Sequence, residues 1–298
     1  GTKKWNVTTT ATTMGKFFWI HIPKCGSTFE TTLYLWACPA PAALLKQLSN
    51  KSFNLSHFSS FRSPVVRDLQ RYFMINENQA KVWCFARDLR DQAHQPFNKQ
   101  LSGYAMTMVR QPQRRLVSAF ENSLHAFGMT PSKKREMEAQ VMKLLDADVN
   151  GTGALQALET FAGWHGIQSC AVKMLTGFSC AYDASGMKFD RSSMIRRTAL
   201  ATSVLLDQSK IPFFGITDLY NESICLFHAT QGGSVWDIEF HNVHKTRLDS
   251  SANNAAYLIG DRLPLQKHVA EGDSPWDFEG FAVEDPYDEI LYEFALRE

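Results

Sequence analysis

The stretch Phe17-Phe-Trp-Ile-His-Ile-Pro-Lys-Cys-Gly-Ser-Thr-Phe29 decides the fold of this chain. It predicts a short apolar strand that breaks at Pro23 into a Lys-Cys-Gly-Ser-Thr turn, followed by a helix over 29–35. At such a junction the unpaired N–H groups of the helix N-terminus, the helix dipole and the charge of Lys24 favour an anion. We therefore expect a phosphate or sulfate site early in an α/β fold. A Walker loop carries its lysine after the last glycine, whereas Lys24 precedes Gly26, which weakens a nucleotide triphosphatase interpretation.

A second run follows the same logic. Tyr104-Ala-Met-Thr-Met-Val-Arg110 predicts a strand, and Pro112 then stands at the first position of a helix. One apolar stripe of that helix is expected to carry Leu116, Phe120, Leu124 and Phe127. Another face combines Arg114 or Arg115 with Ser118. Together with Arg110 at the strand end, this face would form a second anion site; a solvated basic helix is the alternative.

These two runs resemble motifs of the sulfotransferases that use PAPS (3′-phosphoadenosine 5′-phosphosulfate). The first is similar to their phosphosulfate-binding loop. The second, Arg110-Gln-Pro-Gln-Arg-Arg-Leu-Val-Ser118-Ala-Phe, is similar to the R-D-P-x-x-R-x-x-S-x-[YF] run that holds the 3′-phosphate in the Golgi carbohydrate sulfotransferases of the heparan sulfate 2-O/6-O type. Gln111 replaces the aspartate of that run, so we expect a local carboxylate contact to be lost.

Later runs resemble the same family in the same order. They are the strand and helix over 213–227, the loop Phe240–Arg247 and the closing helix over 288–296. The resemblance implies an α/β, P-loop-like three-layer fold with a mostly parallel central sheet flanked by helices. Alternating patterns between the motifs agree with a mostly parallel sheet, with helices over 64–73, 133–148, 153–164 and 190–208 and strands over 81–86 and 211–216.

The resemblance also implies the roles of individual residues. Lys24 would stabilise charge on the bridging oxygen and leaving phosphate of PAPS. The 5′-phosphosulfate would be held by Lys24, Cys25, Gly26, Ser27, Thr28 and Phe29, and the 3′-phosphate by Arg110, Ser118 and Arg115, with Lys245 near the cofactor. The product would be PAP, and we expect no metal requirement, because a sulfuryl group carries less charge than a phosphoryl group.

A base must take the proton of the acceptor hydroxyl, and histidine is the usual choice near neutral pH. We choose His94, because Ala93-His-Gln-Pro-Phe97 resembles the G-H-x-P-[FY] segment of the family. His57 is the rival, since the region after the first helix also borders the site in these folds. His21, inside the first strand, is expected to be a packed neighbour of the loop.

Composition agrees with this interpretation but does not select it. A chain of 298 residues with 44% apolar content can bury a core as one domain, which we place at 16–298. The threonine-rich segment 1–15 is interpreted as a linker at a trimmed end, for which either a membrane anchor or a signal segment upstream is the expected explanation. A net charge of +1 does not favour a nucleic acid partner.

The compartment is indicated by sequons and cysteines. Five Asn-x-Ser/Thr sites, where roughly two would occur by chance, favour the Golgi lumen, with the cytoplasm as the alternative. Six cysteines form no zinc-type spacing. Cys170 with Cys180 is the expected disulfide, while Cys84 and Cys225 are expected to be buried thiols.

Three functions remain open from the sequence. The first is PAPS-dependent sulfation of a glycan hydroxyl, and the second is the same chemistry on a small alcohol or metabolite. The third is a nucleotide-binding or kinase-like P-loop protein, which dependence on magnesium would reveal.

Overall fold

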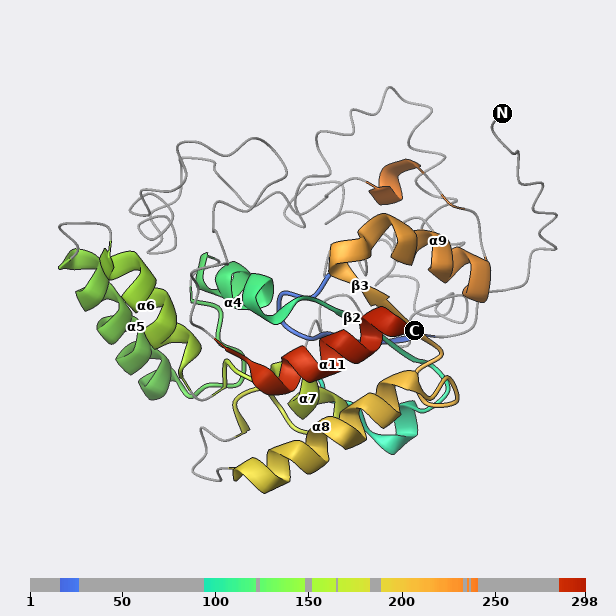
Figure 1. Ribbon diagram of the computed structural model, residues 1–298, viewed down its shortest axis with the longest axis horizontal. Helices are drawn as coiled ribbons and strands as arrows, with labels where there is room; N and C mark the ends of the chain where they lie inside the picture. Colours follow the sequence, from blue (N-terminus) through green and yellow to red (C-terminus); the bar gives the residue numbers. More distant parts are fainter. Residues whose placement is uncertain are drawn as a thin grey trace, which may run out of the picture.

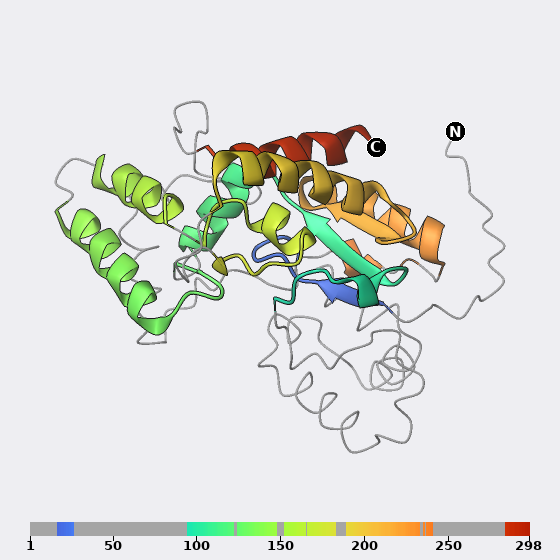
Figure 2. The same ribbon diagram turned by 90° about the horizontal axis from the view of Figure 1, so that it is seen from below.

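The computed structural model describes residues 17–26, 94–121, 124–147, 152–164, 166–182, 189–232, 235, 237–240 and 284–298. Three strands lie in the middle of this part of the chain with helices packed around them, and two helices, α5 (Pro131–Asp146) and α6 (Thr152–Ala162), project to one side (Figures 1 and 2). The strands are β1 (Phe18–Ile20), β2 (Ala105–Val109) and β3 (Phe213–Ile216).

The sheet is parallel throughout these strands. Its order is β1-β2-β3, with Trp19 opposite Met106 and Val109 opposite Ile216. Every residue of β1 and β2 is buried, which explains why both strands are continuous apolar runs rather than alternating ones. Thr107 is the polar exception, and its hydroxyl donates to the Ile20 carbonyl at 2.9 Å. The expected parallel sheet flanked by helices is therefore confirmed for the described residues.

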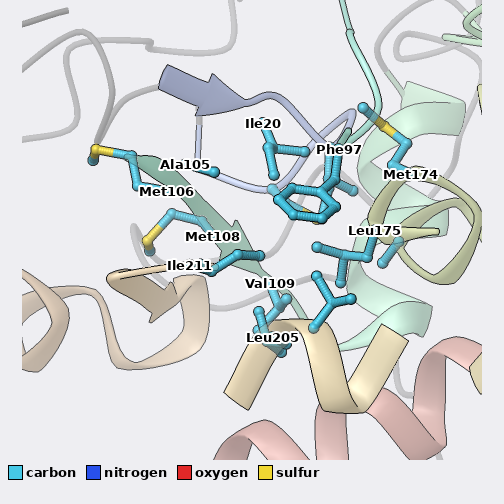
Figure 3. Close-up of a cluster of buried hydrophobic side chains, with 14 of the residues drawn as sticks. Ile20, Phe97, Ala105, Met106, Met108, Val109, Met174, Leu175, Leu205 and Ile211 are labelled. Carbon is cyan, nitrogen blue, oxygen red and sulfur yellow. The ribbon is translucent and has the colours of Figure 1, made fainter. Parts of the chain in front are cut away.

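The main core forms between the sheet and four helices: α7 (Cys170–Leu175), α8 (Arg191–Leu206), α9 (Tyr220–Gln231) and α11 (Pro286–Arg297). In Figure 3, Val109 points toward Leu205 of α8 and Leu175 of α7, while Met106 and Met108 lie on the other side of β2. Helix α9 follows β3 directly and packs against it.

A second core lies between three other helices, α4 (Pro112–Glu121), α5 (Pro131–Asp146) and α6 (Thr152–Ala162). Phe120 of α4 meets Phe161 of α6 with ring centroids 5.7 Å apart, and Met137 and Val141 of α5 are fully buried beside them. Helix α4 therefore connects the end of β2, which it follows in the chain, with the α5–α6 pair, against which it packs.

Several sequence predictions are confirmed at the level of single elements. Pro112 begins α4 as expected, and the helices expected over 133–148, 153–164 and 190–208 correspond to α5, α6 and α8. Two caps were not foreseen. Thr130 caps α5, whose first residue is Pro131. Asp190 caps α8 by accepting from Ser193 N at 2.6 Å. Short 3-10 turns at Lys99–Leu101 (η5), Thr217–Leu219 (η7) and Asp237–Phe240 (η8) complete the described elements.

Three expectations were wrong. The apolar stripe of α4 was expected to continue through Leu124, but the helix ends at Glu121 and Leu124 follows with φ of 51°. Cys225 was expected to be buried, but it is exposed on α9. Helix α7 was not foreseen at all, because its six residues are too few to produce a helical period. The expected helices over 29–35 and 64–73, the strand over 81–86 and the loop over 241–247 lie outside the described residues.

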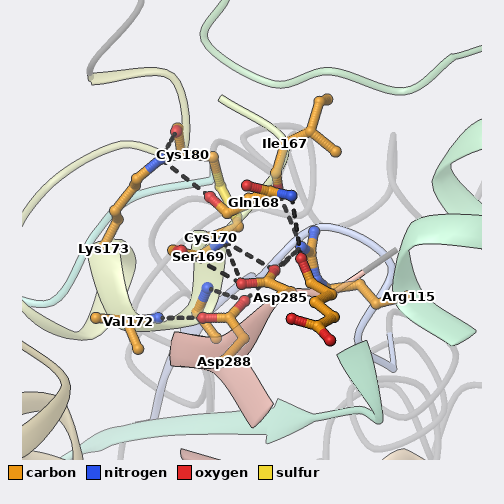
Figure 4. A network of polar contacts seen from close by, with 12 residues as sticks. Arg115, Ile167, Gln168, Ser169, Cys170, Val172, Lys173, Cys180, Asp285 and Asp288 are labelled. Atoms are coloured by element: carbon orange, nitrogen blue, oxygen red, sulfur yellow. Dashed lines mark hydrogen bonds and ion pairs between the residues drawn. A yellow bond between two sulfur atoms is a disulfide. The ribbon is translucent and has the colours of Figure 1, made fainter. Parts of the chain in front are cut away.

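A buried polar network holds α11 against the rest of the molecule (Figure 4). The Arg115 guanidinium donates to the Ile167 carbonyl at 2.7 Å and to Asp285 at 3.1 Å, and it lies 3.7 Å from Asp288. Asp288 accepts from Ala171 N and Val172 N, so its carboxylate caps the first turn of α7. Two carboxylates share one guanidinium here, and burial raises the pKa of Asp288 to about 7.

The Cys170–Cys180 disulfide, expected from the sequence, is present at the same end of α7. It closes a short loop whose constraint on the unfolded chain is worth about 2–3 kcal/mol. The buried Lys173 ammonium donates to the Gln168 and Cys180 carbonyls, which tie this loop together. Among the described residues, no helix combines the length and apolar character needed to cross a membrane.

Replacing Arg115 by methionine should lower the free energy of unfolding by about 3–5 kcal/mol, because Asp285 and Asp288 would keep their hydrogen bonds to backbone N–H groups but lose the counter-charge of their buried carboxylates. Arg114→Met is the matched control. Arg114 also contacts an aspartate at 3.0 Å, but 48% of its side chain is exposed against 4% for Arg115. We expect that change to stay within about 1 kcal/mol. Urea unfolding of both variants measures the difference, and equal losses would show that burial of the pair is irrelevant.

Candidate functional site

The loop after β1 forms one wall of the site. The chain turns back at once, with Ile22 N donating to the Ile20 carbonyl and Cys25 N donating to the Ile22 carbonyl. Lys24 adopts φ of 65° and Gly26 φ of 76°, both in the left-handed region. A lysine rarely takes this conformation, and such backbone strain concentrates at functional sites.

Gly26 is required by close packing on β2. A Cβ atom at this position would stand 2.8 Å from Met108 Cγ, where no side chain fits. The loop therefore lies directly on the carboxyl end of β2, which brings Lys24 to the residue that follows that strand.

Arg110 is that residue, and it lies beside Lys24. Its Nη1 donates to the Lys24 carbonyl at 3.3 Å. Burial lowers the pKa of Lys24 to about 8, with the charge of Arg110 as the second cause, and burial also lowers the pKa of Arg110. Within the described part of the chain, no carboxylate forms an ion pair with Lys24 or Arg110. The charges of Glu121 and Asp218 act on these cations only from a distance, raising their pKa values less than burial lowers them, so two neighbouring cations without a direct ion pair favour an anionic ligand.

Asp218 replaces the carboxylate that the sequence motif lacks. Its Oδ2 accepts from Gln111 N at 2.9 Å and from the Tyr292 hydroxyl at 3.2 Å, and its Oδ1 accepts from Arg114 at 3.0 Å. The expectation that Gln111 costs the site a local carboxylate contact was therefore wrong. The contact comes from the turn after β3, more than a hundred residues later in the chain.

Ser118 and Arg115 were expected beside Arg110 on one face of α4. Ser118 is half-buried two turns into the helix. Arg115 is only 3% exposed and is used by the network with Asp285 and Asp288, so it serves packing and not the expected contact with a cofactor.

His94 lies next to the β1 loop. Its Nδ1 is 2.7 Å from the His21 carbonyl oxygen, and the two imidazole rings are 4.3 Å apart. A carbonyl oxygen can only accept, so Nδ1 carries the hydrogen and Nε2 holds the free lone pair of the neutral ring. Burial lowers the pKa of His94, which keeps the ring neutral and able to accept a proton. His21 is buried, as expected for a packed neighbour of the loop, but it follows β1, which ends at Ile20, and does not lie inside the strand.

His125 belongs to the same group and was not foreseen. Its ring lies 5.5 Å from that of His94, and Phe127 covers His94 at 4.1 Å. Burial lowers the pKa of His125 to about 4, with further contributions from His94, Lys24 and Lys134. The left-handed Leu124 turns the chain back after α4, a change of direction that the apolar pattern of the sequence concealed.

Cys25 is an inert member of the loop. The thiol is 1% exposed, and burial raises its pKa to about 12, so it contributes packing and its backbone rather than a thiolate. Ser27, Thr28, Phe29, His57 and Lys245, also expected at the site, lie outside the described residues. No group of three or more His, Cys, Asp or Glu side chains within the described residues is arranged to hold a metal ion.

A scan of the sequence against protein-family models found no match, and neither the curated proteins nor the solved structures that were searched gave one. The resemblance to sulfotransferases therefore depends on the motifs and on the geometry described above.

Gly26→Ala should destabilise the protein more than Gly103→Ala. Both glycines have a positive φ, so each alanine carries about 1–2 kcal/mol of backbone strain. The nearest atom to a Cβ at Gly103 is 3.7 Å away, whereas Gly26 meets Met108 at 2.8 Å, which adds about 1–3 kcal/mol. Thermal unfolding of both variants measures the excess, that is, the additional loss of stability in Gly26→Ala compared with Gly103→Ala. Combining Gly26→Ala with Met108→Gly, which removes both the Met108 Cγ atom and the Met108 Cβ atom that stands 2.9 Å away, should remove that excess in a double-mutant cycle, and full additivity would contradict the close approach.

Proposed function

We propose that this chain is a PAPS-dependent O-sulfotransferase, which moves the sulfuryl group of PAPS to an acceptor hydroxyl, and that it has the P-loop-like three-layer fold of such enzymes. One observation carries the proposal. Lys24 and Arg110 lie together at the carboxyl ends of two parallel strands, partly buried and without a paired carboxylate among the described residues. Ligands of parallel α/β sheets bind at this edge.

In the proposed reaction, an oxygen–sulfur bond forms from the acceptor hydroxyl, and the bond from sulfur to the bridging phosphate oxygen breaks. PAP leaves with the electron pair of that bond. Little covalent chemistry is required of the protein, so positioning and charge stabilisation dominate. Lys24 would stabilise the charge that develops on the leaving phosphate.

His94 would accept the proton of the acceptor hydroxyl at Nε2. The His21 carbonyl fixes the opposite ring nitrogen as a donor, which orients the ring and leaves Nε2 as the basic atom. The lowered pKa agrees with a base that is neutral before the reaction. His57 remains the rival for this role.

The two phosphate groups of the nucleotide would be bound by two different segments, the start of α4 with Arg110 and the loop after β1. Arg110 and Ser118 are proposed to hold the 3′-phosphate, while Gly26, with Cys25, Ser27, Thr28 and Phe29 of the same loop, would surround the 5′-phosphosulfate. Lys245 is kept as a further cofactor contact. A carbohydrate is the proposed acceptor, with a small alcohol as the alternative.

A location in the Golgi lumen is part of the proposal, with the cytoplasm as the alternative. The Cys170–Cys180 disulfide supports the lumen, because such bonds persist in oxidising compartments.

Transfer of labelled sulfate from PAPS, without added metal, tests the function. Two acceptor pools are offered, desulfated polysaccharides and a small-molecule extract, and we expect label in the polysaccharides. Label only in the small molecules would replace the acceptor but keep the chemistry. Transfer of phosphate from ATP that requires magnesium, with no sulfate transfer, would favour a kinase-like protein instead.

His94→Ala should lower kcat in this assay by about 100-fold or more, while the affinity for PAP stays close to that of the wild type. Loss of the base affects the chemical step, because His94 is not proposed to contact the nucleotide. His57→Ala serves as the comparison and should leave kcat unchanged. The reverse result would transfer the role of base to His57.

The affinity for PAP should fall as the pH rises through about 8. The Lys24 pKa of about 8 belongs to the unliganded protein, and a bound anion raises it, so binding takes up a proton above this value. Affinity is therefore complete below pH 8 and decreases by up to about tenfold for each further pH unit. Calorimetry between pH 7 and 9.5 measures the slope, and Lys24→Met should bind weakly with no slope in this range. A slope that survives in Lys24→Met would exclude Lys24 as the titrating group.

A further inference from the structure

The carboxyl ends of all three described strands lie at the same edge of the sheet, because the strands are parallel. The loop 21–26 follows β1 and Arg110 follows β2, and both belong to the proposed site. Thr217 and Asp218 follow β3, where Ile216 is opposite Val109. The residues at this third strand end have no part in the nucleotide binding proposed above.

Thr217 has a hydroxyl group that forms no hydrogen bond with the described residues. The residue is half-buried, but its Oγ1 is fully buried and has no hydrogen-bond partner in the described part of the molecule. Buried hydroxyl groups are nearly always hydrogen-bonded, so an unpaired one requires an explanation. The same oxygen is 3.4 Å from the position that a Cβ atom of Gly26 would take, so it faces the β1 loop.

Arg110, which follows the neighbouring strand β2, also has a buried donor without a partner among the described residues. Its Nε is buried without a hydrogen-bond partner among the described residues, and its Nη1 reaches the Lys24 carbonyl. Two side chains that follow different strands, Arg110 through Nη1 and Thr217 through Oγ1, thus approach the β1 loop, and each has a buried polar atom without a partner among the described residues. An anion with several oxygens would satisfy both groups, and a neutral ligand with few acceptors would not.

The contacts of Asp218 explain why it does not accept a hydrogen bond from Arg110 Nε. This carboxylate lies in the turn after β3 and accepts from Arg114, from Gln111 N and from Tyr292. It is close enough to raise the pKa of Arg110, although burial lowers that pKa more strongly. These contacts of Asp218 go to the start of α4 and to Tyr292 of α11 rather than to Arg110. The Arg110 side chain is therefore able to bind a ligand.

We propose that the turn after β3 is the third wall of the anion site, in which the Thr217 hydroxyl donates a hydrogen bond to a phosphate oxygen of the bound nucleotide beside Arg110 Nε. The proposal rests on the function proposed above, because it takes the nucleotide to be PAPS or its product PAP. A threonine hydroxyl adds a donor without adding charge, which suits a site that already contains two cations.

Calorimetric binding of PAP to Thr217→Val and Thr217→Ser tests this role. Valine has the shape of threonine without the hydroxyl, so the dissociation constant should rise about 10- to 100-fold, as expected for a lost hydrogen bond to a charged group. Serine keeps the hydroxyl and should stay within about threefold of the wild type.

Thr198→Val is the matched control. Thr198 is also a buried threonine, but its hydroxyl donates to the Met194 carbonyl inside α8. This variant should bind PAP as the wild type does.

Unfolding of the unliganded proteins separates binding from structure. Because the Thr217 hydroxyl has no partner in the described residues, Thr217→Val should be as stable as the wild type or more stable. A clear loss of stability in Thr217→Val would mean that the hydroxyl supports the fold, which would overturn the proposal.

The failures of the two proposals are distinguishable. A wild-type protein that does not bind PAP would refute the proposed function, and this role of Thr217 with it. A wild-type protein that binds PAP, with Thr217→Val binding equally well, would refute the role of Thr217 alone.

Discussion

The buried guanidinium of Arg115 is the contact on which the arrangement of the helices depends. It joins α4 to the Ile167 carbonyl and to two aspartates of the α11 segment, and one of these aspartates caps α7. A buried charge that loses its partner is far more costly than a surface pair, so these elements cannot shift independently. Because Arg110 and Arg115 stand on the same strand–helix junction, fixing Arg115 in the interior leaves Arg110 at the sheet edge.

At that edge the electrostatics are opposite to those of the interior. Arg115 is surrounded by carboxylates, whereas Lys24 and Arg110 have no ion-pair partner among the described residues and lose part of their hydration. This arrangement destabilises the unliganded protein and would be relieved by an anion. His94 and His125, both with lowered pKa values, remain neutral beside these cations. The site thus combines positive charge for an anion with a neutral imidazole for a proton.

The motif around Arg110 illustrates how a sequence departure is compensated in space. The R-D-P run places its carboxylate next to the arginine, and Gln111 removes it from this chain. Asp218 returns a carboxylate to the Gln111 backbone from the turn after β3. Since β2 and β3 are paired and parallel, the position after one strand is always close to the position after the other. A carboxylate that is missing from one position of the sequence can therefore be supplied by a residue far away along the chain.

Local patterns in the sequence were enough to predict the strands and helices whose apolar runs are local. These include the β1 loop, the β2–α4 junction with Pro112 at its start, the β3–α9 unit and the helix over 190–208 that corresponds to α8. Lys24, Arg110 and His94 could also be singled out, because each belongs to a motif a few residues long. The neighbours of these residues follow from tertiary packing. His125, Thr217 and Asp218 reach the site through a left-handed turn and a strand pairing, and Arg115 leaves it for the interior. Such contacts join residues up to 170 positions apart, and they depend on packing and burial that no local pattern encodes.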